Sequence, residues 1–228
     1  MKDKSFKFIK KDMVIYMQQY NRWAGKKMNA LGDSLTEADI SGIGDMGTPW
    51  TAYMQKLCGF EMCRNYGICG DFLSGKGGMA ERYQAMDNDA DIICVFGGTN
   101  DFWVSSPLGD KDDSDISTFY GALDTLIKGL AVKYPYAEIF FVTPPKFRST
   151  LYGWETFKQN ANGNILKDFR DAIVEIADYY SLPVLDLYTN CGMSCYLDTG
   201  IFRPDGLHFS NEGYKRIAYR IAGFVNNL

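Results

Sequence analysis

Ser34 is the residue of this 228-residue chain whose setting first suggests chemistry. It follows Gly-Asp in the segment MNALGDSLTE, where a short apolar run passes into a turn. Gly, Asp and Ser are ordinary turn residues, so the segment by itself is equally consistent with a simple turn. A serine hydroxyl becomes a good nucleophile when a general base lies beside it. Ser34 is therefore a candidate nucleophile, and its base must come from elsewhere in the chain.

His208 is the only histidine of the chain, and it follows Asp205 by three residues in FRPDGLHFSNEGY. A carboxylate on the same turn can accept a hydrogen bond from Nδ1 and leave Nε2 free to take a proton from a serine. Pro204 and Gly206 favour a tight turn at this point. A lone histidine is more often a surface or core residue, and D-x-x-H spacing alone is a weak signal. The pair needs support from other motifs.

Two more polar segments lie between Ser34 and His208. NYGICGD covers residues 65–71, and GGTND covers residues 97–101 at the end of an apolar run. With the Gly-Asp-Ser and Asp-Gly-Leu-His segments they make four blocks over residues 32–208. This set resembles the SGNH hydrolases, also called the GDSL esterase/lipase family, and the four blocks occur in the order found in that family.

The resemblance implies a serine esterase that needs no metal and no organic cofactor. Ser34 would be the nucleophile, His208 the general base and acid, and Asp205 the group that orients the imidazole. The oxyanion hole would use the backbone N–H groups of Ser34 and Gly70 and the side-chain amide of Asn100. Such donors suit the negative charge that develops on oxygen during acyl transfer. The substrate would be a small-molecule acyl ester.

Other readings stay open at this point. The order Ser, Asp, His also occurs in α/β-hydrolases, but the G-x-S-x-G elbow is missing because Thr36 replaces its last glycine. A thioesterase, a lysophospholipase or an O-acyltransferase would use the same residues. A non-catalytic relative that binds carbohydrate or lipid would be expected to lack one of the three catalytic side chains. We expect Asp33 and Asp101 to support turns rather than to react.

The elements that must position these residues alternate between strands and helices. Apolar runs predict strands over residues 28–31, 60–65, 91–96, 138–143 and 183–188. Three of these runs are continuously apolar, which is typical of parallel strands buried on both faces. Helical spacing, with Thr48 and Ser210 opening the first and last helices, predicts helices over residues 48–59, 117–134, 165–180 and 210–225. The alternation predicts a doubly wound α/β fold. With the resemblance, we expect a flavodoxin-like three-layer α/β/α sandwich around a mostly parallel five-stranded sheet.

Four long polar loops should meet at one edge of this sheet, around Ser34. They cover residues 36–48, 103–115, 147–163 and 189–204. Aromatic residues on these loops are candidate substrate contacts, as an acyl pocket or as a platform for a sugar ring: Trp103, Phe147, Trp154 and Phe202. We expect part of this set to pack the loops instead. No loop carries a long apolar run, which favours acyl groups of about two to four carbons.

Charge and cysteine content limit the partners. The net charge is −4, so the chain lacks the basic footprint of a nucleic-acid-binding protein. Six cysteines without a C-x-x-C pair favour reduced thiols, and we expect no metal site. Nothing in the sequence indicates the oligomeric state.

The first residues differ from the rest in charge. Residues 1–27 carry eight Lys or Arg against two Asp, a net charge of +6. We therefore predict a basic N-terminal extension over residues 1–25 and one domain over residues 26–228. No apolar run has the length of a signal-peptide core or a membrane span, so we expect a cytoplasmic protein.

Overall fold

The sheet at the centre of the molecule has five parallel strands in the order β4-β1-β5-β6-β7. The computed structural model describes residues 21–40, 44–45, 47–149, 151–197 and 200–228, so most of the predicted basic extension lies outside it. The strands are β1 (Lys27–Gly32), β4 (Met62–Gly67), β5 (Ile92–Phe96), β6 (Glu138–Val142) and β7 (Val184–Leu185). Every residue of β5 is buried, as expected for a strand covered on both faces. The predicted parallel sheet is confirmed.

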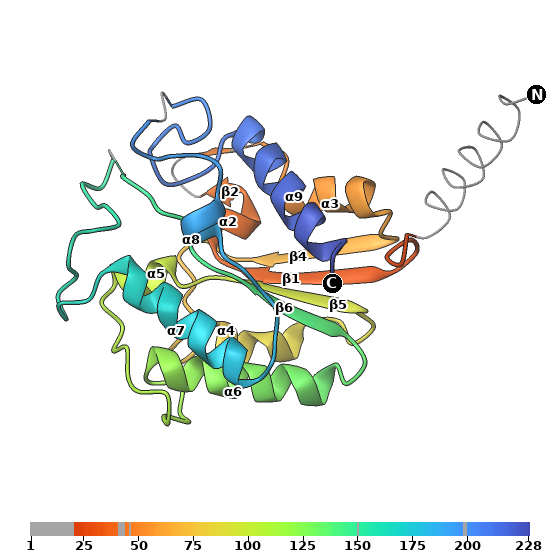
Figure 1. The fold of residues 1–228 in the computed structure, drawn as a ribbon, viewed down its shortest axis with the longest axis horizontal. Helices are drawn as coiled ribbons and strands as arrows, with labels where there is room; N and C mark the ends of the chain where they lie inside the picture. The colour runs from red at the N-terminus through yellow and green to blue at the C-terminus, as the bar shows by residue number, and fades with distance from the viewer. Residues whose placement is uncertain (1–20, 41–43, 46, 150, 198–199) are drawn as a thin grey trace, which may run out of the picture.

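Helices cover both faces of the sheet and make three layers (Figure 1). On one face lie α4 (Met79–Arg82), α6 (Phe119–Lys133) and α7 (Leu166–Tyr179), and on the other lie α3 (Trp50–Cys58) and α9 (Asn211–Val225). Successive residues of a strand point to opposite faces of the sheet and pack into two separate hydrophobic cores. Val95 packs with the first group of helices, and Cys94 packs with the second. The predicted three-layer α/β/α sandwich is therefore confirmed.

Two predicted boundaries were wrong. The strand predicted over residues 183–188 is short, because the chain turns at Asp186 into α8 (Leu187–Asn190), and the Asp186 carboxylate accepts a hydrogen bond from the N–H of Thr189. Thr48 does not cap α3. Pro49 occupies that position without a side-chain hydrogen bond, and the Thr48 N–H donates to Asn211 Oδ1 instead. The Asp186 cap is a local signal that the prediction overlooked, whereas the contact of Thr48 with Asn211 joins residues that are distant in sequence.

The carboxyl ends of the strands all point to one edge, on the left in Figure 1, where the long loops gather. Short elements follow some of the strands there: α2 (Ser34–Glu37) after β1, and α5 (Thr99–Trp103) after β5. The loop predicted over residues 36–48 contains a two-stranded antiparallel pair, β2 (Asp39–Ile40) and β3 (Gly44–Asp45). The 3₁₀ helix η1 (Tyr83–Ala85) continues α4. Parallel strands and their crossovers thus bring distant segments together at this edge.

Backbone packs against backbone where α2 crosses the ends of β1 and β4. A Cβ atom added to Gly67 would lie 2.2 Å from the backbone nitrogen of Glu37. At Gly32 the same addition would come within 2.3 Å of Thr36 Oγ1, in the side chain, and within 2.8 Å of the backbone oxygen of Phe96. A side chain at Gly67 would therefore overlap the backbone of α2, the helix that begins at Ser34.

A buried carboxylate holds the start of α2. Asp33 is fully buried, and its Oδ1 accepts a hydrogen bond of 2.9 Å from the N–H of Leu35. Its Oδ2 has no hydrogen-bond partner among the described residues. Burial raises the pKa of Asp33 to about 7, and the neighbouring charges of Asp71 and Asp101 act in the same direction. As the sequence indicated, Asp33 supports a turn.

The close approach at Gly67 is testable by substitution. Gly67→Ala should lower the free energy of unfolding by about 2–3 kcal/mol, because the added methyl group overlaps the backbone of α2. Gly223→Ala is the matched control: this glycine lies in α9 with nothing within 4 Å, so alanine should stabilise the helix by about 0.5–1 kcal/mol. Urea unfolding measures both. Equal effects at the two positions would contradict the packing described for α2.

The raised pKa of Asp33 predicts a pH-dependent effect on stability. Between about pH 4 and pH 7 the unfolded chain releases this proton while the folded chain retains it, so the contribution of Asp33 to stability falls as the pH rises. An asparagine at this position keeps the helix cap and has no proton to lose. Asp33→Asn should therefore be more stabilising at pH 8 than at pH 5, by up to about 2.6 kcal/mol. Urea unfolding at both pH values tests this, and an equal difference at the two would refute it.

Candidate active site

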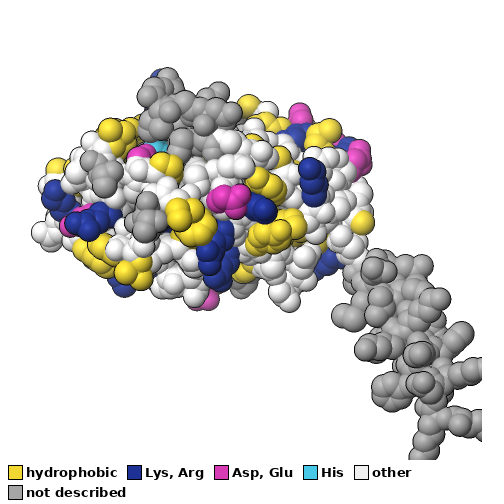
Figure 2. Space-filling model, turned by 90° about the horizontal axis from the view of Figure 1, so that it is seen from above, with side chains coloured by type: hydrophobic (Ala, Val, Ile, Leu, Met, Phe, Trp, Pro, Cys, Tyr) yellow, Lys and Arg dark blue, Asp and Glu magenta, His cyan; other side chains and the backbone are white. Residues whose placement is uncertain are grey.

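Ser34, His208 and Asp205 form a continuous chain of hydrogen-bonded side chains. Ser34 Oγ lies 3.1 Å from His208 Nε2, and His208 Nδ1 lies 2.6 Å from Asp205 Oδ2. The three residues are only 6%, 5% and 8% exposed, and little of the histidine reaches the surface in Figure 2. Serine hydroxyl, imidazole and carboxylate are thus aligned in the order that proton transfer from the serine requires.

The elements at the carboxyl edge fix this alignment from both sides. Ser34 is the first residue of α2, directly after β1 and its cap Asp33. Asp205 and His208 lie on the turn before α9, which begins at Asn211 under a side-chain cap from Ser210. The hydroxyl of Tyr214, in the first turn of α9, donates to the carbonyl of Ser34 over 3.3 Å. Helix α9 therefore contacts Ser34 directly, and it also follows His208 closely in the chain.

The charge of Asp205 defines the hydrogen positions on the imidazole. Burial would raise the pKa of this carboxyl group, but hydrogen bonds from His208 and from the backbone N–H of Leu207 hold its pKa below the ordinary value. An ionised carboxylate only accepts hydrogen bonds, so Nδ1 of His208 carries the hydrogen. The lone pair of the neutral ring is then on Nε2, facing Ser34.

Gly70 and Asn100, predicted as oxyanion-hole residues, lie on two segments that are tied to each other. Gly70 has φ +78° in the turn from Ile68 to Asp71, which is closed by a 3.1 Å bond from the Asp71 N–H to the Ile68 carbonyl. The N–H of Ile68 donates to the carbonyl of Gly32 over 3.0 Å. Asn100, in the first turn of α5, donates its side-chain amide to the Asp71 carbonyl over 2.9 Å. The Gly70 turn is thus bonded to the end of β1, and the Asn100 side chain is bonded to that turn.

Arg82 connects the same segments, and no sequence motif indicated it. Its guanidinium donates to the Asp71 carboxylate over 2.8 Å, and to the carbonyls of Tyr66 and Gly32 over 3.0 and 3.1 Å. These carbonyls belong to the ends of β4 and β1. The Arg82 side chain therefore fixes the strand ends from which α2 and the Gly70 turn begin. Its partners, the Asp71 carboxylate and two backbone carbonyls, come from other segments of the chain, and no motif in the sequence links them to Arg82.

Asp101 supports the segment that follows the Gly70 turn. Its carboxylate is fully buried and accepts hydrogen bonds from the N–H groups of Leu73 and Ser74 and from the Ser74 hydroxyl. Burial raises the pKa of Asp101 to about 6 despite these bonds. The predicted supporting role agrees with these contacts.

The four aromatic candidates have different surroundings. Phe147 is fully buried against Phe102, so the structure assigns it to the core, and its prediction as a substrate contact is corrected. Trp103 and Trp154 are half-buried and pack together with their rings 5.3 Å apart. Phe202 is half-buried beneath the guanidinium of Arg216, at 5.0 Å. Of these four, Trp154 lines the pocket described next.

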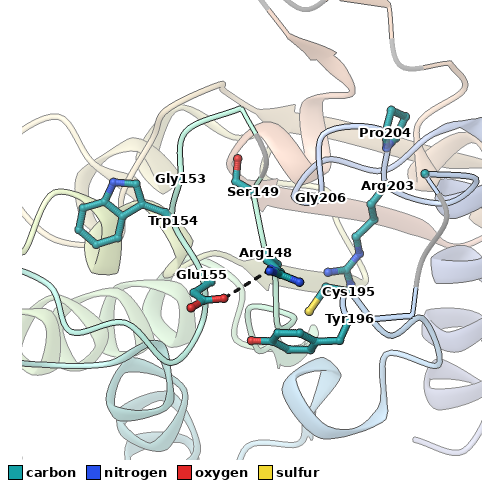
Figure 3. A pocket seen from close by; sticks show the side chains of 11 residues that line it. Arg148, Ser149, Gly153, Trp154, Glu155, Cys195, Tyr196, Arg203, Pro204 and Gly206 are labelled. Carbon is teal, nitrogen blue, oxygen red and sulfur yellow. Dashed lines mark ion pairs between the residues drawn. The ribbon is translucent and has the colours of Figure 1, made fainter.

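A pocket of about 800 Å³ lies against the turn that carries Asp205 and His208 (Figure 3). Pro204 and Gly206, on either side of Asp205, form part of its wall. The other described residues that line it are Arg148, Ser149, Gly153, Trp154, Glu155, Cys195, Tyr196, Gly200 and Arg203. Two arginines, Arg148 and Arg203, line it, and neither was singled out in the sequence.

Among the described residues, no group of three or more His, Cys, Asp or Glu side chains is arranged to hold a metal ion. None of the helices in that part of the chain is long and apolar enough to cross a membrane.

The chain is similar to known proteins in sequence and in fold. Two solved structures resemble the chain closely: one at 33% identity with a TM-score of 0.84, and a protein from Lactobacillus plantarum at 32% identity with a TM-score of 0.80, each covering 90% of this chain and 98% of its own. The lipase/acylhydrolase from Enterococcus faecalis shares the fold, at 21% identity and a TM-score of 0.62 over 89% of this chain and 96% of its own. No curated protein matches significantly. The model of the GDSL-like Lipase/Acylhydrolase family matches residues 30–216. The chain belongs to this family, and it is a hydrolase of ester bonds.

Proposed function

We propose that the protein is a serine esterase in which Ser34, His208 and Asp205 act together. Ser34 Oγ attacks the ester carbonyl while His208 Nε2 takes the hydroxyl proton, and Asp205 stabilises the imidazolium that results. His208 then returns the proton to the leaving alcohol, and water releases the acyl group in a second step. The single observation that supports this most is the unbroken chain from Ser34 Oγ to Asp205 Oδ2, at 3.1 and 2.6 Å.

We assign stabilisation of the oxyanion to the N–H groups of Ser34 and Gly70 and to the amide of Asn100. The N–H of Ser34, at the first position of α2, has no acceptor within its own helix. The positive φ of Gly70 directs the backbone of its turn in a way that other residues adopt at a cost. Arg82 and Asp71 hold this turn, so its donors would be positioned before the substrate arrives.

The substrates we propose are short acyl esters, acetyl esters first, with a carbohydrate as one candidate alcohol. None of the four polar loops expected around Ser34 carries the long apolar run that a groove for a long acyl chain would need. The walls of the pocket at the 204–206 turn carry Arg148, Glu155 and Arg203, so this pocket suits a polar alcohol part better than an alkyl chain. The ring of Trp154 offers a flat surface suited to a sugar.

Hydrolysis of p-nitrophenyl acetate, butyrate and decanoate at sub-micellar concentration tests this proposal. The kcat/KM should fall from acetate to decanoate. Ser34→Ala should lower kcat by a factor on the order of 10⁴–10⁶ and leave Tm within a few degrees, because only a hydroxyl is removed. Ser114→Ala, at an exposed serine outside the hydrogen-bonded chain, is the control. If Ser34→Ala keeps a tenth of the rate, Ser34 is not the nucleophile, and a kcat/KM that rises toward decanoate would exclude the short-chain preference.

A further inference from the structure

Arg203 is a buried cation without a carboxylate partner among the described residues. It is 2% exposed, and its guanidinium donates to the carbonyl of Lys146 and, over 2.9 Å, to Cys191 Sγ. The ring of Phe209 lies 5.0 Å from the guanidinium carbon. The Nε atom has no hydrogen-bond partner in the part of the chain that the structure describes. None of these partners of Arg203 carries a carboxylate.

Other partly buried arginines of the chain are paired. Arg82 has the carboxylate of Asp71 at its guanidinium, and Arg170 has that of Asp186 at 2.6 Å. A buried charge without a counter-charge is costly, because it loses hydration and gains no Coulomb attraction in return. The positive charge of Arg203 is therefore uncompensated within the described residues, although the fold supplies carboxylates to similar side chains elsewhere.

A second guanidinium faces the same pocket. Arg148 and Arg203 both line it, and in Figure 3 their side chains extend toward the same part of it, next to Cys195 and Tyr196. The Arg148 side chain is 61% exposed, and it makes only a loose ion pair of 3.6 Å with Glu155. Its guanidinium carbon lies 5.9 Å from the ring centre of Tyr196. Arg148 is thus accessible to a ligand, whereas Arg203 acts on the pocket through its charge.

The position of the pocket identifies the part of the substrate that it would hold. Its wall includes Gly206, whose carbonyl accepts a 3.1 Å hydrogen bond from the Arg148 N–H, on the turn that carries His208. In an acyl transfer of the proposed kind, the histidine gives its proton to the leaving oxygen, so the leaving alcohol lies on the histidine side. The opposite wall includes Trp154, which packs on Phe102 of α5, the helix that carries Asn100.

We propose that this pocket binds the alcohol part of the ester and that this alcohol carries an anionic group. Arg148 would donate hydrogen bonds to the anion, and the buried charge of Arg203 would attract it. The proposal rests on the proposed function for its assignment of the leaving-group side. It adds a substrate class, negatively charged acyl esters, to that function.

A matched pair of acetyl esters tests the charge preference. We compare kcat/KM for 4-acetoxybenzoate, which is anionic, with that for the neutral 4-acetoxybenzamide. The ratio in the wild type divided by the ratio in Arg148→Gln should be about ten, which corresponds to about 1.4 kcal/mol. Added salt should reduce the wild-type ratio by screening. Lys56→Gln, at an exposed lysine of α3, is the control and should leave the ratio unchanged.

The variant Arg203→Met tests whether Arg203 contributes to ligand binding or only to the stability of the fold. Removing an unpaired buried charge should maintain or raise Tm, and the preference for the anionic ester should be lost. A fall in Tm with the preference intact would show that Arg203 serves the fold alone. Arg148→Gln, at an exposed side chain, keeps the test decisive if Arg203→Met does not fold.

Binding of the products separates this proposal from the esterase proposal. By calorimetry, the wild type should bind 4-hydroxybenzoate more tightly than 4-hydroxybenzamide, and Arg148→Gln should remove the difference. If this holds without hydrolysis of any ester, the preference of the pocket for anions stands, and the proposed function, with the assignment of the pocket to the leaving alcohol, is wrong. If acetyl esters are hydrolysed with the same ratio in the wild type, Arg148→Gln and Arg203→Met, the pocket assignment is wrong and the esterase proposal stands.

Discussion

The contact between Ser34 and His208 joins residues 174 positions apart, and the architecture of the sheet makes it possible. β1 lies inside the sheet, between β4 and β5, so Ser34 emerges near the middle of the carboxyl edge. Helix α9 packs on the same face as α3, and the turn before it brings His208 back to that edge. Because all five strands are parallel, their ends and the following loops meet there. The separation of 3.1 Å thus depends on the placement of the whole chain.

Buried hydrogen bonds fix the backbone at the carboxyl edge of the sheet, in addition to apolar packing. Arg82 binds the carbonyls at the ends of β1 and β4, and Asp101 binds the N–H groups of the segment after the Gly70 turn. Such contacts are directional, and each satisfies backbone groups that would be costly to bury unpaired. Arg203 breaks this pattern because its charge has no counterpart in the described residues. We therefore relate Arg203 to a ligand rather than to the fold.

Features with a local signature were predictable from the sequence. The continuous apolar run of β5 and the spacing of Asp205 and His208 depend on neighbouring residues, and the structure agrees with both. Arg82 and Arg203 were missed because their partners come from distant segments. Phe147 was misassigned for the same reason: polar neighbours suggested an exposed loop, whereas Phe102, from another element, buries its ring. The roles of these three side chains could be assigned only from the structure, because distant segments of the chain supply their contacts.

Ser34 is tested as the nucleophile most directly by identifying the residue that becomes acylated. The protein is mixed with p-nitrophenyl acetate, quenched in acid within the first turnover, digested and analysed by mass spectrometry. A fluorophosphonate, which forms a stable adduct, is used in parallel. We expect one acetyl group or one phosphonyl group on Ser34, and none after Ser34→Ala. A label on another residue, or turnover of the ester with Ser34 unmodified by either reagent, would contradict this assignment.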